Sequence, residues 1–283
     1  MFSFSYGEES SGGGIRNVNL TINTGEFVLL TGESGCGKTT ITRLVNGLVP
    51  HYYEGNLEGD VLLDGKSVSD TPLYDLAAMV GSVFQNPKSQ FFNVDTDSEL
   101  AFACENLGYP QEDILKRIDR TVSDYHIEDL MGRSVFALSG GRKRQKIACA
   151  SSSVLLPGIM VLDEPSSNLD MAAIDDLRQV LSLWKKQGKT ILIAEHRLYY
   201  LHDLADRVLY VKDGEIEREY TPAEFDSLSD GTRKEMGLRP FSLSKLKPAN
   251  QYQAHTAKQM EFQNFCFAYK KREPESLHIP SAE

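Results

Sequence analysis

The chain of 283 residues carries 30 Lys and Arg residues against 40 Asp and Glu residues, which gives a formal net charge of -10. This acidic balance argues against electrostatic binding of DNA, RNA or anionic lipid over the whole surface, although a local basic patch is compatible with it. With 41% hydrophobic and 25% charged residues, the composition excludes a disordered or collagen-like chain. The length allows one large domain with appendages or two small domains.

No membrane-spanning or targeting segment is expected. The most apolar stretch, residues 147–162, is interrupted by three serines and by Pro157-Gly158. It is shorter than the ~20 residues that a spanning helix needs. Residues 1–14 have neither the basic nor the apolar region of a signal peptide. The four cysteines form no CxxC pair, which fits a reducing cytoplasm better than a zinc site or a disulfide framework.

In chain order, apolar runs and turn signals predict strands first, then helices, then an alternation of the two. The expected strands of the first third are Phe2–Tyr6, Val18–Ile22, Glu26–Thr31 and Val61–Leu63. A helix over 38–47 follows the third of these strands. Within residues of about 96–156, helices are expected over 98–103, 112–125 and 141–152, with Asp97 or Ser98 as the N-cap of the first. Strands at Ile159–Leu162, Thr190–Ala194 and Val208–Val211 then alternate with a helix over Ala172–Lys186. This alternation predicts an α/β fold with a mostly parallel sheet covered by helices.

The end of the sequence resembles its beginning. Residues 265–269 (FCFAY) resemble residues 2–6 (FSFSY), and residues 276–283 (SLHIPSAE) resemble residues 19–26 (NLTINTGE). Chance similarity of two short strands is the alternative. Because the two matches occur in the same order, the tail is interpreted as the truncated start of a second copy.

A glycine-rich turn joins the predicted strand Glu26–Thr31 to the helix that follows it. It fits the pattern GxxxxGK[ST] and consists of Gly32, Glu33, Ser34, Gly35, Cys36, Gly37, Lys38 and Thr39, followed by Thr40. Between a strand and a helix, such glycines let backbone N–H groups surround phosphate oxygens. We expect Lys38 to reach the β- and γ-phosphates of a nucleotide and the Thr39 hydroxyl to bind Mg²⁺. A fortuitous glycine-rich turn is the alternative.

Two carboxylates, Asp163 and Glu164, end the apolar strand at Ile159–Leu162. The C-terminal end of a buried strand lies at the ligand-binding edge of an α/β sheet. We expect Asp163 to hold the Mg²⁺ shell and Glu164 to polarise a water against the γ-phosphate, as a general base or a water-positioning group. Without the phosphate loop, the same pair would indicate the start of a solvated loop.

A further anion site is predicted at residues 138–141 (LSGG), which precede a basic helix beginning with Arg142. A Ser-Gly-Gly turn at a helix start offers a hydroxyl and free N–H groups. Taken alone, Ser-Gly-Gly is also common linker sequence.

These motifs and their order resemble those of the ABC-type ATPases across about residues 1–225. The resemblance implies a P-loop NTPase fold with a mostly parallel core sheet, an antiparallel β subdomain and a helical subdomain over about 96–156. It also implies a linker or loosely packed extension over 226–260 and the start of a truncated second ABC domain over 261–283. The polar, loop-like sequence after residue 225 favours the same linker.

The resemblance also assigns roles to single residues. Tyr6 resembles the aromatic residue that stacks on adenine, Gln85 the glutamine that contacts Mg²⁺ and the attacking water, and His196 the histidine that senses the γ-phosphate. Alone, Tyr6 would indicate a packed strand aromatic and His196 an exposed loop histidine. The signature motif, which binds the opposite nucleotide, and the D-loop would be carried by Ser139, Gly140, Gly141 and Asp170.

In this family, ATP lies between two domains arranged head to tail, so that one domain holds half of each site. The resemblance therefore implies ATP and Mg²⁺ as cofactors, with Thr39, Gln85 and Asp163 around the metal. It implies a second ABC ATPase domain as a partner, in tandem or as a dimer. It further implies an integral membrane transporter component at the cytoplasmic face of the cell membrane, and no nucleic acid. The hydrophobic residues Phe91, Phe92, Leu100 and Phe102 either form its docking groove or belong to the core of the helical subdomain.

A narrower resemblance, to the ATPases of energy-coupling-factor importers of vitamins and transition-metal ions, rests on residues 83–95, 99–110 and 195–198. Some members carry two ATPase domains in one chain, which would account for the repeat. One departure is Arg142, where the ABC family usually has Gln. Either the change is tolerated drift, or this signature serves a slower or asymmetric nucleotide site.

Two other functions stay open. The first is a soluble ABC ATPase acting on nucleic acid or ribosomes, against which the acidic charge counts. Gln85 and Ser139 are also only 54 residues apart, which leaves no room for a coiled-coil insertion. The second is a nucleotide switch whose turnover Arg142 impairs.

Overall fold

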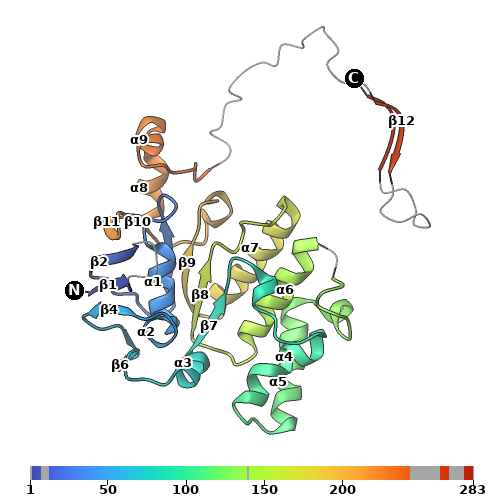
Figure 1. The fold of residues 1–283 in the computed structure, drawn as a ribbon, viewed down its shortest axis with the longest axis horizontal. Helices are drawn as coiled ribbons and strands as arrows, with labels where there is room; N and C mark the ends of the chain where they lie inside the picture. The colour runs from blue at the N-terminus through green and yellow to red at the C-terminus, as the bar shows by residue number, and fades with distance from the viewer. Residues whose placement is uncertain (1, 8–12, 139, 243–261, 268–276, 283) are drawn as a thin grey trace. The chain divides into compact units, whose positions relative to one another are not determined.

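The computed structural model describes residues 2–7, 13–138, 140–242, 262–267 and 277–282 (Figure 1). By its internal contacts the chain divides into two compact units, Met1–Lys245 and Leu246–Glu283. Among the described residues, no helix combines the length and the apolar character needed to cross a membrane.

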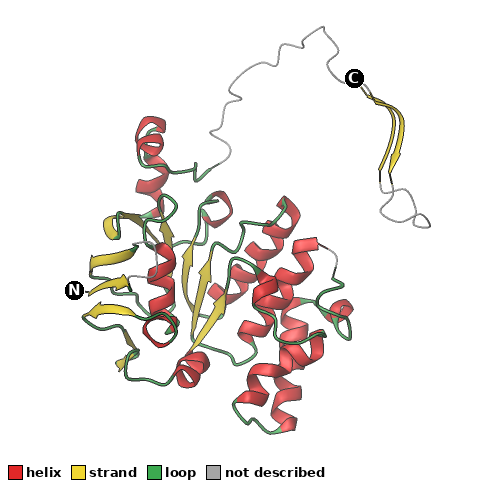
Figure 2. Cartoon of the chain, viewed as in Figure 1, coloured by secondary structure: helices red, strands yellow, loops and turns green. Residues whose placement is uncertain are grey.

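The first unit is built on a six-stranded sheet with helices on both sides (Figure 2). From one edge to the other, the strands are β11 (Glu215–Tyr220), β10 (Arg207–Lys212), β3 (Phe27–Thr31), β9 (Thr190–Ala194), β8 (Ile159–Asp163) and β7 (Val80–Val83). All neighbours from β10 to β7 pair in parallel, and β11 alone is antiparallel to its neighbour. The predicted α/β fold with a mostly parallel sheet is confirmed.

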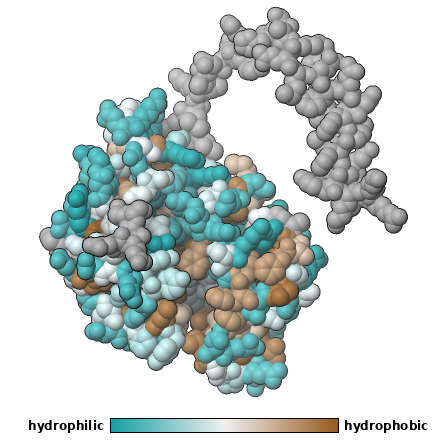
Figure 3. Space-filling view, in the orientation of Figure 1, coloured by the Kyte–Doolittle hydropathy of each residue, from teal (hydrophilic) through white to brown (hydrophobic). Residues whose placement is uncertain are grey.

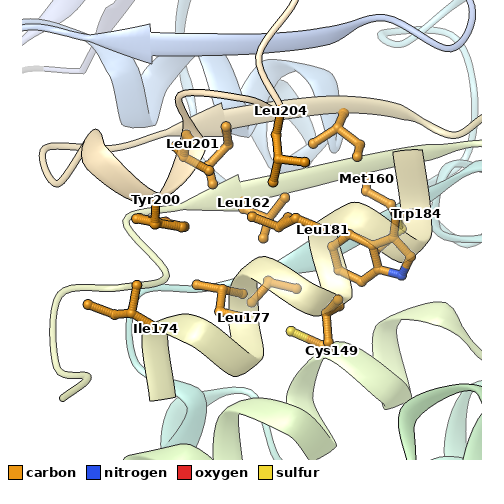
Figure 4. Packing of buried hydrophobic residues seen from close by; sticks show 14 of the residues in the cluster. Cys149, Met160, Leu162, Ile174, Leu177, Leu181, Trp184, Tyr200, Leu201 and Leu204 are labelled. Atoms are coloured by element: carbon orange, nitrogen blue, oxygen red, sulfur yellow. The ribbon is translucent and has the colours of Figure 1, made fainter. Parts of the chain in front are cut away.

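Hydrophobic residues alternate between the two faces of this sheet, because successive side chains of a strand point to opposite sides. On β3, Val28 and Leu30 pack on the side of helix α1 (Lys38–Val45), whereas Leu29 belongs to the cluster on the opposite face. Helix α7 (Met171–Lys186) covers that opposite face with Leu177, Leu181 and Trp184, which lie near Met160 and Leu162 of β8 (Figure 4). Both faces of the central strands are therefore buried. The ends of these strands set the positions of the loops that follow.

An antiparallel sheet of the order β2-β1-β4 lies at the start of the unit, and it includes β1 (Phe2–Tyr6), β2 (Gly14–Val18) and β4 (Gly55–Glu58). The strand expected at Val18–Ile22 is wrong, because β1 pairs with Gly14–Val18, where Phe4 faces Ile15. Leu20 and Ile22 instead pack against the core outside any strand. A short hairpin of β5 (Leu62–Leu63) and β6 (Lys66–Ser67) follows, with its turn at Asp64-Gly65.

The helical part contains α4 (Thr96–Asn106), α5 (Gln111–Tyr125) and α6 (Gly140–Ser153), and two short helices, α2 (Leu48–His51) and α3 (Leu73–Met79), precede it. The N-cap of α4 is Asp95 rather than Asp97 or Ser98, because the Asp95 carboxylate accepts a hydrogen bond from the Ser98 N–H at 2.9 Å. Single turns of 3₁₀ helix occur at Pro87–Ser89, Glu128–Leu130 and Tyr199–Leu201.

The first unit continues beyond residue 225 in regular structure. Helices α8 (Pro222–Ser227) and α9 (Asp230–Glu235) follow β11. The side chains of Phe225 and Phe241 are fully buried in the same core as α7, with their rings in edge contact. The part of the predicted linker over 226–242 is therefore corrected, since its apolar residues complete the core. Residues 243–261 lie outside the described residues.

The second unit contains β12 (Phe262–Phe267), which pairs antiparallel with β13 (Leu277–Ala282). Phe265 faces Ile279 in this pairing. The sequence repeat relates β13 to residues 20–25, whereas in the first unit β1 pairs with Gly14–Val18. Both pairs of strands are antiparallel. However, the partner strands β2 and β13 do not correspond to each other in the sequence repeat.

Candidate functional site

The glycine-rich turn lies between the fully buried strand β3 and helix α1, in the context that the sequence predicts. Gly32 has a φ of 149° and Gly37 a φ of 111°, a conformation that favours glycine. A Cβ atom at Gly32 would lie 2.1 Å from the Val211 carbonyl oxygen, so a side chain there would displace β10. The close approach of loop and strand explains why glycine occupies this position.

Lys38 points back into this turn. Its side chain is 3% exposed, and Nζ donates hydrogen bonds to the carbonyl oxygens of Gly32 at 3.0 Å and Glu33 at 2.8 Å. A buried ammonium group needs such partners, because desolvation disfavours an isolated charge. The same geometry holds a positive charge in the concave side of the loop, where anionic oxygens would be attracted.

Thr39 and Asp163 bring two hard oxygen atoms together. The Thr39 hydroxyl donates to the Asp163 carboxylate at 3.1 Å, which joins the start of α1 to the end of β8. Burial raises the pKa of the Asp163 carboxyl above its ordinary value, and the Thr39 hydrogen bond opposes the shift. One hydroxyl and one carboxylate fit Mg²⁺, which is commonly held by one or two carboxylates together with substrate phosphates. Among the described residues, no cluster of three or more His, Cys, Asp or Glu suggests an all-protein metal site.

The three predicted catalytic side chains meet at the same edge of the sheet. Gln85 Nε2 donates to Glu164 Oε2 at 3.2 Å, and His196 Nε2 lies 3.1 Å from Glu164 Oε1. Gln85 follows β7, Glu164 follows β8 and His196 follows β9, so three separate segments contribute. Because parallel strands end at one edge, this convergence follows from the topology. The geometry suits Glu164 to contact a water, and its role stays a prediction.

His196 is held mainly in its neutral form. Burial lowers the pKa of His196, and the nearby charge of Lys38 lowers it further. The carboxylates of Glu164 and Glu195 act in the opposite direction but do not reverse the shift. Near neutral pH, the imidazole is therefore neutral and retains one nitrogen that can donate and one that can accept a hydrogen bond.

Tyr6 lies beside the first turn of α1. Its hydroxyl is 3.3 Å from Thr40 Oγ1 and accepts a hydrogen bond from Arg43 at 3.1 Å. The ring makes edge contacts with Phe4 and Tyr53. Tyr6 is therefore next to the phosphate loop, as the predicted adenine contact requires, and stacking on a base remains a prediction.

The signature and the D-loop are in direct contact. Ser139 lies outside the described residues, while Gly140 begins helix α6. A Cβ atom at Gly141 would lie 3.2 Å from both the Asn168 carbonyl oxygen and the Leu169 side chain. Asp170 is the N-cap of α7, since its carboxylate accepts from the Ala173 N–H at 2.8 Å.

Arg142, the departure from the family pattern, has a partner within the chain. Its guanidinium binds both carboxylate oxygens of Asp176 on α7, with the second bond at 3.1 Å. Asp176 is only 5% exposed, and Lys146 Nζ lies 3.7 Å from it. Arg142 therefore joins α6 to α7.

Sequence reasoning missed the groups that hold these loops together, in particular Glu195, Arg197 and Tyr200. Glu195 is a buried carboxylate, and Arg197 reaches the Leu169 carbonyl oxygen at 2.9 Å. A charged residue directly after a buried apolar strand was the available signal. Residues 195–198 contributed to the resemblance, but the sequence did not indicate their contacts, because some of the partners lie in distant segments.

Comparison with known proteins identifies the family of this chain. A family model described as ABC transporter matches residues 15–167, more than half of the chain. The chain belongs to the ABC transporter family. A putative ABC transporter ATP-binding protein of Treponema denticola is 46% identical over 245 residues, which cover 87% of this chain and 50% of that protein. With a second Treponema denticola relative the share is 49%, so the chain spans about half the length of these two relatives.

Solved structures of ABC ATPases share the fold. CbiO1 of Clostridium perfringens, described as part of the ABC transporter complex cbiONQ, is similar with a TM-score of 0.66 and 27% identity, over 79% of this chain and 89% of that chain. The dimeric cassette MJ0796 in a post-hydrolysis state bound to ADP and phosphate has a TM-score of 0.66 and 25% identity, over 78% and 99% of the two chains. The chain accordingly has the ABC ATPase fold.

Proposed function

We propose that this ABC ATPase powers a membrane importer of a micronutrient, namely a vitamin, a vitamin precursor or a transition-metal ion. The observation that carries the proposal is the convergence of Gln85, Glu164 and His196 beside the phosphate loop, which gives the chain the parts for ATP turnover. The importer class is supported by the resemblance to energy-coupling-factor ATPases and by the similarity to cbiO1, which belongs to a transporter complex.

In the proposed reaction, Glu164 orients or deprotonates the attacking water, and Gln85 and His196 fix the direction of its carboxylate. Lys38 supplies fixed positive charge at the phosphates, and Thr39 with Asp163 would hold Mg²⁺, which neutralises phosphate charge when bound. The energy of closing two cassettes around ATP would move helices of a membrane component at the cytoplasmic face of the membrane.

The proposed docking surface for that membrane component lies on the helical part of the first unit. Hydrophobic side chains gather there over helices α4–α7 (Figure 3). Phe92 is 75% exposed and stacks on Phe102, and Val94 and Phe136 are also exposed. Leu100 is fully buried and Phe91 packs against the core, so these two of the four residues considered for a groove belong to the core.

We further propose that the chain works with a second cassette, either in tandem or as a dimer. A single cassette offers its signature to a nucleotide bound elsewhere, and the solved cassette MJ0796 is described as dimeric. The tandem arrangement, with a second ABC domain starting near 261, is supported by the sequence repeat. It is supported too by the greater length of the Treponema denticola relatives.

The alternative of a nucleotide switch impaired by Arg142 has less support. The Arg142 guanidinium is engaged by Asp176 within the chain, which is a packing contact between helices. An ATPase assay in the presence and absence of a second cassette separates slow turnover from none. The other alternative, a soluble ATPase acting on nucleic acid or ribosomes, finds no specific support in the described residues.

The importer proposal is tested by expressing the chain, tagged, in its host and purifying it from detergent-solubilised membranes. The expected result is co-purification of an integral membrane component and a small hydrophobic substrate-binding protein, and ATP-dependent uptake in vesicles that Glu164→Gln abolishes. Purification with ribosomes or nucleic acid instead, with none in membranes, would contradict the proposal.

A further inference from the structure

A buried carboxylate lies directly before His196. Glu195 is 1% exposed, and its two oxygens accept four hydrogen bonds. Oε1 accepts from the backbone N–H groups of His196 at 2.7 Å and Arg197 at 3.0 Å. Oε2 accepts from the Ser166 N–H at 3.2 Å and the Tyr200 hydroxyl at 2.8 Å. Every partner is a donor, so the ionised carboxylate is fully used as an acceptor.

One of these bonds, from the Ser166 N–H, joins two loops that carry different functional side chains, whereas the other three lie within the turn of residues 195–200. Ser166 lies two residues after Glu164, and His196 begins the turn after β9. The same two loops meet once more where the Glu164 N–H donates to the Ala194 carbonyl oxygen at 2.8 Å. Glu164 itself has a positive φ of 45°, so the loop turns sharply at this residue. The Ser166–Glu195 and Glu164–Ala194 hydrogen bonds therefore hold the backbone that carries Glu164 beside the backbone that carries His196.

Arg197 extends this connection to the D-loop. Its guanidinium donates to the Leu169 carbonyl oxygen at 2.9 Å, one residue before the Asp170 cap of α7. The signature backbone at Gly141 lies close to Asn168 and Leu169, since a Cβ atom there would be a tight 3.2 Å from both. A continuous set of contacts thus leads from His196 through Arg197 and the D-loop to the signature turn.

We infer that Glu195 and Arg197 are positioning residues for ATP hydrolysis. Glu195 fixes Glu164 relative to His196, and Arg197 makes the D-loop and the signature follow the turn that carries His196. A buried acceptor of four hydrogen bonds suits this role, because replacing it leaves donors unsatisfied and shifts both loops. The inference rests on the water-activating roles proposed for Glu164 and His196, and it is independent of the transported substrate.

The test uses the full 283-residue chain at protein concentrations where turnover per chain no longer rises. Turnover (kcat), the KM for ATP and the affinity for a fluorescent ATP analogue are measured for Glu195→Gln, Tyr200→Phe, Arg197→Ala and Arg197→Lys. Melting temperature and circular dichroism show whether each variant folds. Glu235→Gln and Arg218→Ala serve as matched controls, because both side chains are exposed.

Glu195→Gln is expected to lower kcat by about 10- to 100-fold, since a small misplacement of reacting groups has effects of this size. The glutamine side chain would place its NH₂ group opposite N–H or O–H groups that now donate hydrogen bonds to the carboxylate. A donor would then face a donor. Tyr200→Phe removes one donor of four and is expected to lower kcat by about 2- to 10-fold. In both variants KM and analogue affinity stay within about twofold, because the phosphate loop is untouched.

Arg197→Ala is expected to lower kcat by about 3- to 30-fold, in the range found for coupling between sites. Arg197→Lys restores part of the loss, because an ammonium group can also donate to the Leu169 carbonyl oxygen. The inference is overturned if folded Glu195→Gln and Arg197→Ala keep kcat within twofold of the wild type. It is equally overturned if nucleotide affinity falls in proportion to kcat, which would indicate a general loss of structure.

Glu164→Gln in the same assay distinguishes the proposed role of Glu164 from the positioning roles of Glu195 and Arg197. If it leaves kcat unchanged, the proposed role of Glu164 fails, and the inference fails with it. If Glu164→Gln stops turnover while the Glu195 and Arg197 variants behave as wild type, the positioning inference alone is wrong.

Discussion

The nucleotide edge of the core sheet and the signature end of α6 present their functional groups in opposite ways. At the sheet edge, side chains at or just beyond the ends of β3, β7, β8 and β9 contact one another within the chain, as Thr39 with Asp163 and Glu164 with His196 do. At the signature, the predicted binding groups are backbone and one hydroxyl, and the neighbouring side chain, Arg142, faces α7. One region is assembled by this chain, whereas the other is predicted to offer its groups to a nucleotide bound by a second cassette.

This difference predicts that the two regions depend on different things for activity. Chemistry at the sheet edge should respond to single side chains in this chain. Activity that needs the signature should respond to the availability of a second cassette. The bonds of Arg197 and the packing of Gly141 connect the two regions, so a disturbance in one is expected to reach the other. Four measurements break or sharpen this comparison.

The largest effect is expected from Glu164→Gln. Removing the carboxylate should slow hydrolysis by ~10²–10⁴-fold, the usual contribution of acid–base assistance. ATP binding should persist, because Lys38 and the phosphate loop are unchanged. Single-turnover hydrolysis and equilibrium binding of an ATP analogue measure the two quantities. Unchanged turnover would show that the base has been assigned to the wrong residue.

The second effect concerns the signature. If each site needs a second cassette, turnover per chain should fall by about tenfold or more on dilution to nanomolar concentrations, as mass action requires for an associating protein. Addition of an inactive Glu164→Gln chain should partly restore the turnover of dilute wild type, because the signature of the added chain is intact. A total rate of hydrolysis that stays proportional to chain concentration down to nanomolar levels would contradict the shared-site arrangement.

The sheet edge was predictable because its motifs combine local pattern with topology. A glycine-rich turn after a strand specifies a phosphate loop, and carboxylates that end a buried strand lie at the same edge. Gln85 and His196 were found by resemblance, and the structure brings both to Glu164. The resemblance thus supplied long-range information that composition and period do not hold.

Other features could not be predicted because they depend on tertiary contacts. The strand β7 (Val80–Val83) is short and contains Gly81, so its pattern is weak, and its pairing with β8 makes it a strand. The 226–242 segment looked like a linker because its few apolar residues are spread out. Phe241 is nevertheless fully buried beside Phe225. Likewise, the partners of Glu195 lie both next to it and 29 residues earlier, at Ser166.

A smaller effect is expected from Arg142→Gln, which restores the residue usual in the family. Its guanidinium is 54% exposed, and exposed ion pairs contribute little, so kcat should stay within about threefold of the wild type. The melting temperature should fall slightly, and Asp176→Asn should lower it as well, since it breaks the same contact from the other side. A rise in kcat well beyond threefold would instead support a signature that Arg142 impairs.

The smallest effect is the pH dependence contributed by His196. Its pKa is lowered in the folded protein, chiefly by burial and then by Lys38, so the unfolded chain binds this proton more readily. Below the ordinary pKa of a histidine, about 6.5, protonation therefore favours unfolding, and the stability that neutral His196 permits is lost as the pH falls. The wild type should thus lose more stability between pH 7 and pH 5 than His196→Gln does, measured by urea unfolding at each pH. An identical pH dependence of the two proteins would mean that His196 has the same pKa folded and unfolded. The surroundings of His196 at the sheet edge would then not disfavour its protonation. This would remove one reason for contrasting the sheet edge with the signature.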